Sequence, residues 1–508
     1  MSNSKRIAKN TLFLYLRSFF VLLISLYTSR VILRVLGVED YGIYNVVGGV
    51  ISMVGFLKGN LQSTYQRYYN VEMGRGNEDG VKKLFRSSLS TQYILAAIIL
   101  FLAETIGLWF VIHKLVIPSD RMGAALWIYQ VAVVSFLLTA FSSPFVAAIT
   151  AYERMGVFAF ISVIDAVLRL GIVFTIEWLP GDHLIVYAIL LLCIAILNFL
   201  MYVIYCMKRI PTVSLLPCWD KKTLLSLFSF SGWTIINTLA QTLKTQGLNI
   251  VLNLFFGPVV NAARGISAQI LHAVNQFITS FQTSFRPQLT KSYASGDYAY
   301  MKKLYHSATK LSYFLIFTLS LPILLETPVI LDLWLGDRVP EHTIAFTRLV
   351  LITTFVSSFA NPTSCIVYAT GRIKWFSIIV SGLNLLIVPL AYLFLWLGYE
   401  PESALVVSLV MTVFVHFVRM ILVSRMTVLS LQDYFSAVIL PLCLYTFTAT
   451  LLPFVIIKLM DANWYRLLIT IPGAVLSSLI SMWLLAMNAA EKDMFRNLVI
   501  KKIKKRFK

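Results

Sequence analysis

Apolar residues along this chain form long continuous runs, separated by short junctions that contain proline, glycine or charged residues. A membrane-spanning helix requires about 20 consecutive, predominantly apolar residues. We therefore interpret each run as one predicted span, and the sequence contains fourteen of them. The runs cover residues 11–35, 41–59, 88–112, 123–149, 155–179, 183–206, 224–253, 258–285, 304–331, 343–369, 374–397, 402–424, 435–458 and 463–488.

The composition supports a membrane protein and excludes other classes. Hydrophobic residues make up 58% of the 508 residues and charged residues only 13%, whereas a soluble protein carries about 25% charged residues. The net charge of +20 would suit a nucleic-acid-binding protein, but such a protein would not place basic residues among long apolar runs. We therefore expect no nucleic-acid partner.

No motif for catalysis or for a cofactor occurs in the sequence. Neither GxxxxGK[ST] nor HExxH is present, and the extramembrane segments are too short for a nucleotide-binding domain. The five cysteines form no CxxC pair, which argues against a disulfide framework or a zinc site. We predict that the chain is not an enzyme and has no catalytic residue, metal site or cofactor.

The distribution of lysine and arginine predicts the orientation of the spans, because cytoplasmic loops are enriched in these residues. With the amino terminus inside, the cytoplasmic segments hold 29 of the 43 Lys and Arg residues and the outer segments hold 5. The other 9 lie within the predicted spans. Both termini are therefore predicted to be cytoplasmic. The basic tail, residues 489–508, is expected to contact anionic membrane lipids.

An internal repeat relates the first six spans to the next six. A shift of 220 positions pairs junction residues on the same predicted side of the membrane: Gly37 with Gly257, Gly76 with Gly296, Asn77 with Asp297, and Lys82 and Lys83 with Lys302 and Lys303. A unit of six spans keeps both halves in the same orientation, related by an axis along the membrane normal. Secondary transporters with a central cavity use this arrangement.

We expect an all-α polytopic fold with two six-helix lobes in parallel repeat and two further helices. The N-lobe covers residues 1–206 with spans 1–6, and a cytoplasmic linker covers residues 207–222. The C-lobe covers residues 223–430 with spans 7–12. Spans 13 and 14 cover residues 431–488, and the basic cytoplasmic tail covers residues 489–508.

Three segments resemble a known family. They are GVEDYGIY (37–44), which fits the pattern LG-x-x-(D/E)-YG-x-(Y/F), RYYNVEMGRGNEDGVKKLF (67–85), which is similar to a first long cytoplasmic turn, and SSPFVAAITAYERMGVFAFISV (142–163), which is similar to a junction of the fourth and fifth spans. Over roughly residues 5–430, the chain resembles the polysaccharide-exporter branch, with its Wzx-like O-antigen flippases, of the multidrug/oligosaccharidyl-lipid/polysaccharide superfamily.

The resemblance implies a flippase of the bacterial inner membrane. Members of this branch move an undecaprenyl-pyrophosphate-linked oligosaccharide repeat unit to the outer leaflet for O-antigen, capsule or exopolysaccharide assembly. Lobes that rock around a central cavity would do this by alternating access. A MATE-like drug/cation antiporter of the same superfamily is the alternative, and a membrane glycosyltransferase or polysaccharide polymerase ranks behind both.

Ionisable residues inside spans are costly in a bilayer and usually functional. The predicted spans contain nine basic residues but only four acidic ones, when Lys310, Lys374, Lys458, Arg466 and Glu402 are counted with the adjoining loops. Five of the nine basic residues lie near a span end or have an acidic residue within four positions: Arg17, Lys58, Arg169, Arg348 and Arg419. The other four have no acidic residue within four positions: Arg30, Arg34, Lys244 and Arg264. We predict that they line a basic cavity between the lobes. Such a cavity suits a pyrophosphate linker, because arginine binds phosphate oxygens in a bidentate geometry.

Amide side chains would complement this cavity. Gln241 and Asn249 lie on the seventh predicted span with Lys244 and would hydrogen-bond sugar hydroxyl groups. Two alternatives stay open. Arg30 and Arg34 would also reach the outer interface by snorkelling, and the amides would also link helices to one another.

Acidic residues in the spans are the candidates for binding a coupling cation, H⁺ or Na⁺. We select Asp165 and Glu104 as the deeper carboxylates. Asp165 lies four residues before Arg169 on one predicted helix, so these two charges would also neutralise each other. A drug/cation antiporter would need more carboxylates in its lobes, and their scarcity favours an anionic lipid-linked substrate.

Overall fold

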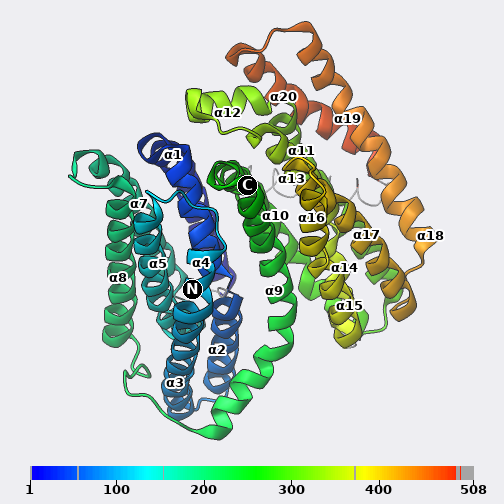
Figure 1. Cartoon of the computed structure of the whole chain (residues 1–508). Coiled ribbons are helices and arrows are strands. Elements are labelled where there is room, and N and C mark those ends of the chain that lie inside the picture. The colour runs from blue at the N-terminus through cyan, green and yellow to red at the C-terminus, as the bar shows by residue number, and fades with distance from the viewer. Residues whose placement is uncertain (1–2, 54–55, 153, 371–372, 488–491, 493–508) are drawn as a thin grey trace. The chain divides into compact units, whose positions relative to one another are not determined.

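Figure 1 shows the computed structural model of the chain. It describes residues 3–53, 56–152, 154–370, 373–487 and 492. Within these residues the chain is helical and contains no β-strand, and eleven helical segments are long and apolar enough to cross a membrane. The chain is a polytopic helical membrane protein, as predicted. The count of fourteen spans and the cytoplasmic location of both termini stay predictions.

The helices of the first half are α1 (Asn3–Ser52), α2 (Phe56–Gly74), α3 (Glu78–Leu102), α4 (Leu108–His113), α5 (Met122–Phe141), α6 (Ser143–Ala151), α7 (Met155–Thr175) and α8 (His183–Arg209). A π-helical turn, Ala103–Gly107, joins α3 to α4. The helices of the second half are α9 (Lys221–Phe256), α10 (Pro258–Ala294), α11 (Tyr298–Leu325), α12 (Thr327–Leu335), α13 (Thr343–Ser357), α14 (Ala360–Thr370), α15 (Ile373–Leu385), α16 (Ile387–Trp396), α17 (Glu402–Met426), α18 (Leu431–Tyr434), α19 (Leu440–Leu459) and α20 (Trp464–Ser481).

Equivalent glycines of the two halves adopt the same backbone conformation. Gly37 has φ 81° and ψ 173°, and Gly257 has φ 75° and ψ −168°. Glycine adopts a positive φ without steric cost, so the chain changes direction at both positions between two successive spans. The element labelled α1 therefore consists of two helical stretches that meet at Gly37. The first stretch contains the first predicted span, and the second contains most of the second predicted span.

The following turn repeats as well. Gly76 and Gly296 have φ values of 68° and 75°, and the next residue caps the helix that follows. Asn77 Oδ1 and Asp297 Oδ1 each accept a hydrogen bond from the backbone N–H three residues later, at 2.9 Å and 3.0 Å. Such a cap satisfies an amide that the first helical turn leaves without a partner. These matched turns agree with the predicted parallel repeat.

An ion pair links the start of the fourth span to the start of the sixth in each repeat. Arg121 Nη1 lies 2.6 Å from Asp182 Oδ2 in the first repeat, and His342 Nδ1 lies 2.6 Å from Glu402 Oε1 in the second. Arg121 Nε also donates a hydrogen bond to Asp40 Oδ1 at 2.8 Å. Asp40 occupies the (D/E) position of the motif in the GVEDYGIY segment, which therefore fastens α1 to the starts of α5 and α8.

Contacts divide the described chain into two compact units. Unit 1 comprises Met1–Ile266, Pro340–His342 and Asn384–Ala404, and unit 2 comprises Ser267–Val339, Thr343–Leu383 and Leu405–Lys508. Unit 1 includes α9 and the first part of α10, because α9 packs against α1 and α2. The lobe boundaries expected from the repeat rest on symmetry rather than compactness, and they stay a prediction.

Each unit has an aromatic core and an apolar exterior. In unit 1, the rings of Phe85 and Phe145 meet edge to face with their centroids 5.3 Å apart. In unit 2, the ring centroids of Phe314 and Tyr445 lie 4.6 Å apart. Many large apolar side chains are exposed, and Trp178 reaches 86%. Extended exposed apolar surface is typical of a protein that faces lipid.

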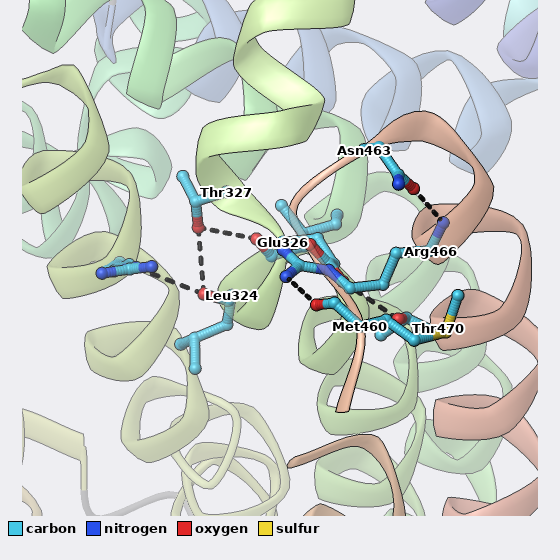
Figure 2. A network of polar contacts seen from close by, with 9 residues as sticks. Leu324, Glu326, Thr327, Met460, Asn463, Arg466 and Thr470 are labelled. Atoms are coloured by element: carbon cyan, nitrogen blue, oxygen red, sulfur yellow. Dashed lines mark hydrogen bonds and ion pairs between the residues drawn. The ribbon is translucent and has the colours of Figure 1, made fainter. Parts of the chain in front are cut away.

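A buried ion pair joins the C-terminal hairpin of α19 and α20 to α11 (Figure 2). Arg466 donates to Glu326 through Nε at 2.9 Å and through Nη2 at 2.6 Å. The hydroxyl of Thr470 donates to Glu326 Oε1 at 2.9 Å, and Arg466 Nη1 donates to the carbonyl oxygen of Met460 at 3.0 Å. Glu326 has no exposed surface. The bidentate pair thus compensates a charge that no water reaches.

We predict that Glu326→Ala lowers the free energy of unfolding of the purified protein by about 3–5 kcal/mol, because it leaves the Arg466 charge buried without its partner. Thermal or denaturant unfolding in detergent measures the change. The double variant Glu326→Leu/Arg466→Leu should lose less, since it removes both charges. Arg348→Ala is the control, because exposed Arg348 donates to the nearby Leu324 carbonyl outside the ion pair. Wild-type stability of Glu326→Ala would contradict this role.

The stabilisation that the Arg121–Asp182 ion pair gives to the first repeat depends on pH. Burial raises the pKa of Asp182, but hydrogen bonds from Arg121 and from the backbone of Leu184 outweigh it and leave this pKa below its ordinary value. A carboxyl group whose pKa is lowered by folding stabilises the fold above its unfolded pKa of about 3.9. That stabilisation is lost as the pH falls through the folded pKa.

We predict that Asp182→Asn lowers the unfolding temperature at pH 7 and that its difference from the wild type shrinks as the pH falls below the unfolded pKa of about 3.9. Asparagine keeps the helix cap that Asp182 provides to α8. Asp182→Ala also removes the cap and should cost about 1 kcal/mol more at every pH. Unfolding curves between pH 7 and pH 3 test this, and a difference that does not vary with pH would argue against the ion pair.

Candidate functional site

Unit 1 contains a pocket of about 250 Å³ between α1, α5, α7 and α8. Its polar lining residues are Tyr44 and Ser52 from α1, Ser135 and Thr139 from α5, and Arg169 from α7. Gly48 also lines it and leaves it open, because a Cβ added there would meet no atom within 4 Å. The pocket therefore lies among helices of the first predicted lobe and has one charged residue on its wall.

Arg169 and Asp165 form an ion pair beside this pocket. Arg169 Nε donates to Asp165 Oδ2 at 2.9 Å, and Asn198 Nδ2 donates to Asp165 Oδ1 at 2.6 Å. Both carboxylate oxygens are therefore engaged by groups of the chain. The side chain of Arg169 is 44% exposed. The predicted mutual neutralisation of Asp165 and Arg169 is confirmed, whereas a coupling cation at Asp165 stays a prediction.

Glu104 lies in different surroundings, on the π-helical turn Ala103–Gly107. The hydroxyl of Tyr129 donates a hydrogen bond to the carbonyl oxygen of Ala103 at 2.7 Å. The same hydroxyl lies close to Gly107, where an added Cβ would be only 2.1 Å from it. Tyr129 thus stabilises the turn. Glu104 itself is exposed and accepts a hydrogen bond from Gln130 at 3.1 Å. The two carboxylates selected from the sequence therefore occupy separate sites.

The basic residues predicted for the substrate cavity all lie in unit 1 but differ in exposure. Arg30 and Arg34 are exposed on successive turns of α1. On α9, Gln241 is exposed and Lys244 is half-buried, one turn apart. Arg264 is buried on α10. Thus α1 carries two basic side chains one turn apart and α9 carries an amide and a basic side chain one turn apart, while the role of all five residues in a cavity stays a prediction.

A chain of amide side chains connects the two repeats within unit 1. Asn253 accepts a hydrogen bond from the backbone N–H of Val116 at 2.9 Å and donates to Asn261 at 2.9 Å. Asn261 donates to Asn249 at 2.7 Å, and Asn249 donates to the carbonyl oxygen of Asn45 at 3.4 Å. Asn253 and Asn261 are fully buried. Asn249, predicted to contact sugar or to link helices, links helices here.

Small residues bring the same helices into backbone contact. A Cβ on Gly42 of α1 would lie 1.9 Å from the carbonyl oxygen of Pro258 at the start of α10. A Cβ on Gly265 would lie 2.7 Å from the side-chain oxygen of Asn45. These contacts and the amide chain lie near the two glycine turns, on the predicted outer side. They hold α1 close to α9 and α10 at that end.

Sequence reasoning missed several partners in these networks. Asn198 and Gln130 carry no local signal, because each donates a hydrogen bond to a carboxylate on a helix that is distant in the sequence. Arg121 and Arg466 were counted only as charges of outer loops, although each forms an ion pair across helices.

The fold and the site define a class of protein. A polytopic helical bundle with two similar halves and with charged groups inside its spans has the architecture of a secondary transporter. A family model described as "Polysaccharide biosynthesis protein" matches residues 7–292, which is more than half of the chain. The chain belongs to this family of polysaccharide biosynthesis proteins.

A curated relative and several solved structures are similar to the chain. The "Uncharacterized membrane protein EpsK" of Bacillus subtilis (strain 168) is 21% identical over 317 residues, which cover 62% of each chain. The match thus spans less than two thirds of the length of that relative.

Among solved structures, the "Lipid II flippase MurJ" in an inward closed conformation has a TM-score of 0.70 at 14% identity, over 96% of this chain and all of that one. An inward-facing MATE family multidrug transporter has a TM-score of 0.65 at 14% identity, over 81% and 95% of the two chains. A transporter of the superfamily from Pyrococcus furiosus has a TM-score of 0.61 at 15% identity, over 82% and 95%. At these identities the similarity shows the fold.

We predict that Gly42→Ala destabilises the protein by about 1–3 kcal/mol, because the added methyl group overlaps the Pro258 carbonyl and forces α1 away from α10. Gly48→Ala on the same helix is the matched control, since its methyl group meets no atom within 4 Å. Unfolding temperatures in detergent compare the two. Equal stability of both variants would contradict a close helix contact at Gly42.

Proposed function

We propose that this protein is a flippase that moves undecaprenyl-pyrophosphate-linked oligosaccharide repeat units across the bacterial inner membrane for surface polysaccharide assembly. The observation that carries the proposal is membership of the polysaccharide biosynthesis family together with a transporter fold. MurJ, which has this fold, is described as a lipid II flippase. Lipid II and the proposed substrate both join a polyprenyl pyrophosphate to sugars.

The charge balance of the spans supports an anionic substrate. Nine basic residues against four acidic ones leave a positive surplus in the apolar segments. We assign Arg30, Arg34, Lys244 and Arg264 to the pyrophosphate, with Gln241 and Asn249 beside them for the glycan. Moving one charge across 100 mV is worth about 2.3 kcal/mol, and an inside-negative potential drives an anion outward. The potential therefore supplies part of the driving force.

Alternating access is the mechanism that this fold supports. The amide chain and the contact of Gly42 with Pro258 hold unit 1 closed on the predicted outer side. Release of the substrate to the outer leaflet requires these contacts to separate, and their reformation returns the protein to the state that accepts substrate from the cytoplasm. Hydrogen bonds between helices contribute about 0.6 kcal/mol each, so a chain of them is stable yet reversible.

A coupling ion, H⁺ or Na⁺, would act through a carboxylate that is free to bind it. Asp165 would have to release Arg169, from which it is 2.9 Å away, before it could take a cation. Within the described residues, Glu104 accepts its side-chain hydrogen bond from a neutral group, the amide of Gln130. We therefore favour Glu104 over Asp165 for this role in the proposed transport cycle.

We predict that Lys244→Ala and Arg34→Ala reduce surface polysaccharide by about 10- to 100-fold at normal protein levels, because each removes a charge-assisted contact to the linker. Surface polysaccharide is measured in cells whose own copy of the gene is deleted and replaced by the variant. Lys244→Arg should restore export. Lys458→Ala is the control, because exposed Lys458 lies over the ring of Phe454 at the end of α19.

The similarity of the fold to a MATE family transporter supports a second candidate function, that of a drug/cation antiporter. The same strains separate the two functions. A deletion strain that loses surface polysaccharide and keeps its drug susceptibility supports the flippase. A deletion strain with full polysaccharide and raised drug susceptibility overturns it in favour of the antiporter.

A further inference from the structure

The pocket of unit 1 combines three features that the transport cycle described above does not use. It is bounded by helices of one compact unit, it carries a guanidinium group on its wall, and it is held open by Gly48. Its volume of about 250 Å³ is slightly below the range of about 300–1,000 Å³ for drug-sized ligands. A polyprenyl carrier with its glycan is far larger, so only a single small group fits.

The ion pair beside the pocket determines the charge that this group must have. Asp165 is engaged on one oxygen by Arg169 Nε and on the other by Asn198. Within the described part of the chain, Nε is the nitrogen of Arg169 for which a hydrogen bond is found. The terminal nitrogens Nη1 and Nη2 therefore remain to donate, and this fork matches a carboxylate or phosphate group.

Hydroxyl groups that α1 and α5 contribute to the pocket wall indicate a hydroxylated ligand. The Ser135 hydroxyl is buried and has no hydrogen-bond partner in the described chain. Ser52 and Thr139 donate their hydroxyl protons to the backbone at 2.9 Å and 2.7 Å, so their oxygens still accept. A buried polar group without a partner is destabilising unless a ligand or water satisfies it. A sugar ring has the hydroxyl groups to do this.

We propose that this pocket, formed by Arg169, Ser135, Ser52, Thr139 and Gly48, binds one acidic sugar of the transported glycan, with a carboxylate or phosphate group on Arg169. The proposal rests on the proposed function and names the chemistry of one repeat-unit sugar. Arg169 then selects for a charged sugar, while Asp165 and Asn198 hold the guanidinium in place. The carrier pyrophosphate is recognised elsewhere, by the basic residues of α1, α9 and α10.

The test measures the unfolding temperature of the purified full-length protein in detergent with four probes: glucuronate, glucose 6-phosphate, glucose and inorganic phosphate. We expect an acidic sugar to raise the unfolding temperature, with glucose and inorganic phosphate having smaller effects. A response to glucuronate alone assigns a carboxylate, and a response to glucose 6-phosphate alone assigns a phosphate. An equal response to glucose, or to inorganic phosphate, overturns the acidic sugar.

Two variants place the effect in the pocket. Gly48→Leu fills the space and should weaken binding by about tenfold or more. Gly171→Leu is its matched control, because Gly171 is an exposed helical glycine whose added Cβ meets no atom within 4 Å. Arg169→Lys keeps a charge for Asp165 but loses the fork, and should also weaken binding. Wild-type binding by both Gly48→Leu and Arg169→Lys overturns the proposal.

The failure of this proposal and that of the proposed function are distinguishable. A deletion strain that keeps full surface polysaccharide overturns the flippase, whatever the pocket binds. Loss of polysaccharide in that strain, combined with unchanged export by Gly48→Leu and Arg169→Lys, overturns the pocket and leaves the flippase standing. Reduced export by Gly48→Leu, with normal export by Gly171→Leu, supports both.

Discussion

The pairing of charges within an apolar surround is the constraint on which this structure depends. A charge removed from water costs several kcal/mol unless a partner compensates it. Glu326 and Arg466 meet this requirement in unit 2, and Asp165 and Arg169 meet it in unit 1. The first pair fastens the C-terminal hairpin to α11. The second, with Asn198, fastens α7 to α8 and leaves a guanidinium fork on the wall of a pocket.

The two repeats share one backbone arrangement but place different side chains at equivalent positions. Both halves turn at a glycine of positive φ after their first span, and both join the start of the fourth span to the start of the sixth. The first half makes this joint with Arg121 and Asp182, and the second half with His342 and Glu402. The two halves thus share the geometry of this joint and differ in the side chains that form it.

The proposed function depends on the excess of basic over acidic residues in the predicted spans. The surplus of basic residues in the spans favours an anionic substrate for the proposed function, and the family identifies polysaccharide biosynthesis as its context. The amide chain of Asn253 and Asn261 closes unit 1 with neutral hydrogen bonds. Neutral contacts separate at lower cost than ion pairs. A transporter needs permanent joints within moving parts and weaker joints between them, and both kinds are present in unit 1.

The sequence by itself determined the helical membrane fold, the turns at Gly37 and Gly257 and the pairing of Asp165 with Arg169, because hydropathy, glycine conformation and i,i+4 spacing are local properties. It also gave the right family from short motifs. Only the tertiary structure decided that Arg466 belongs to Glu326, 140 residues away, and that Asn198 completes the site of Asp165. Such partners meet through helix packing, and a single sequence contains no local pattern that shows which helix faces pack together.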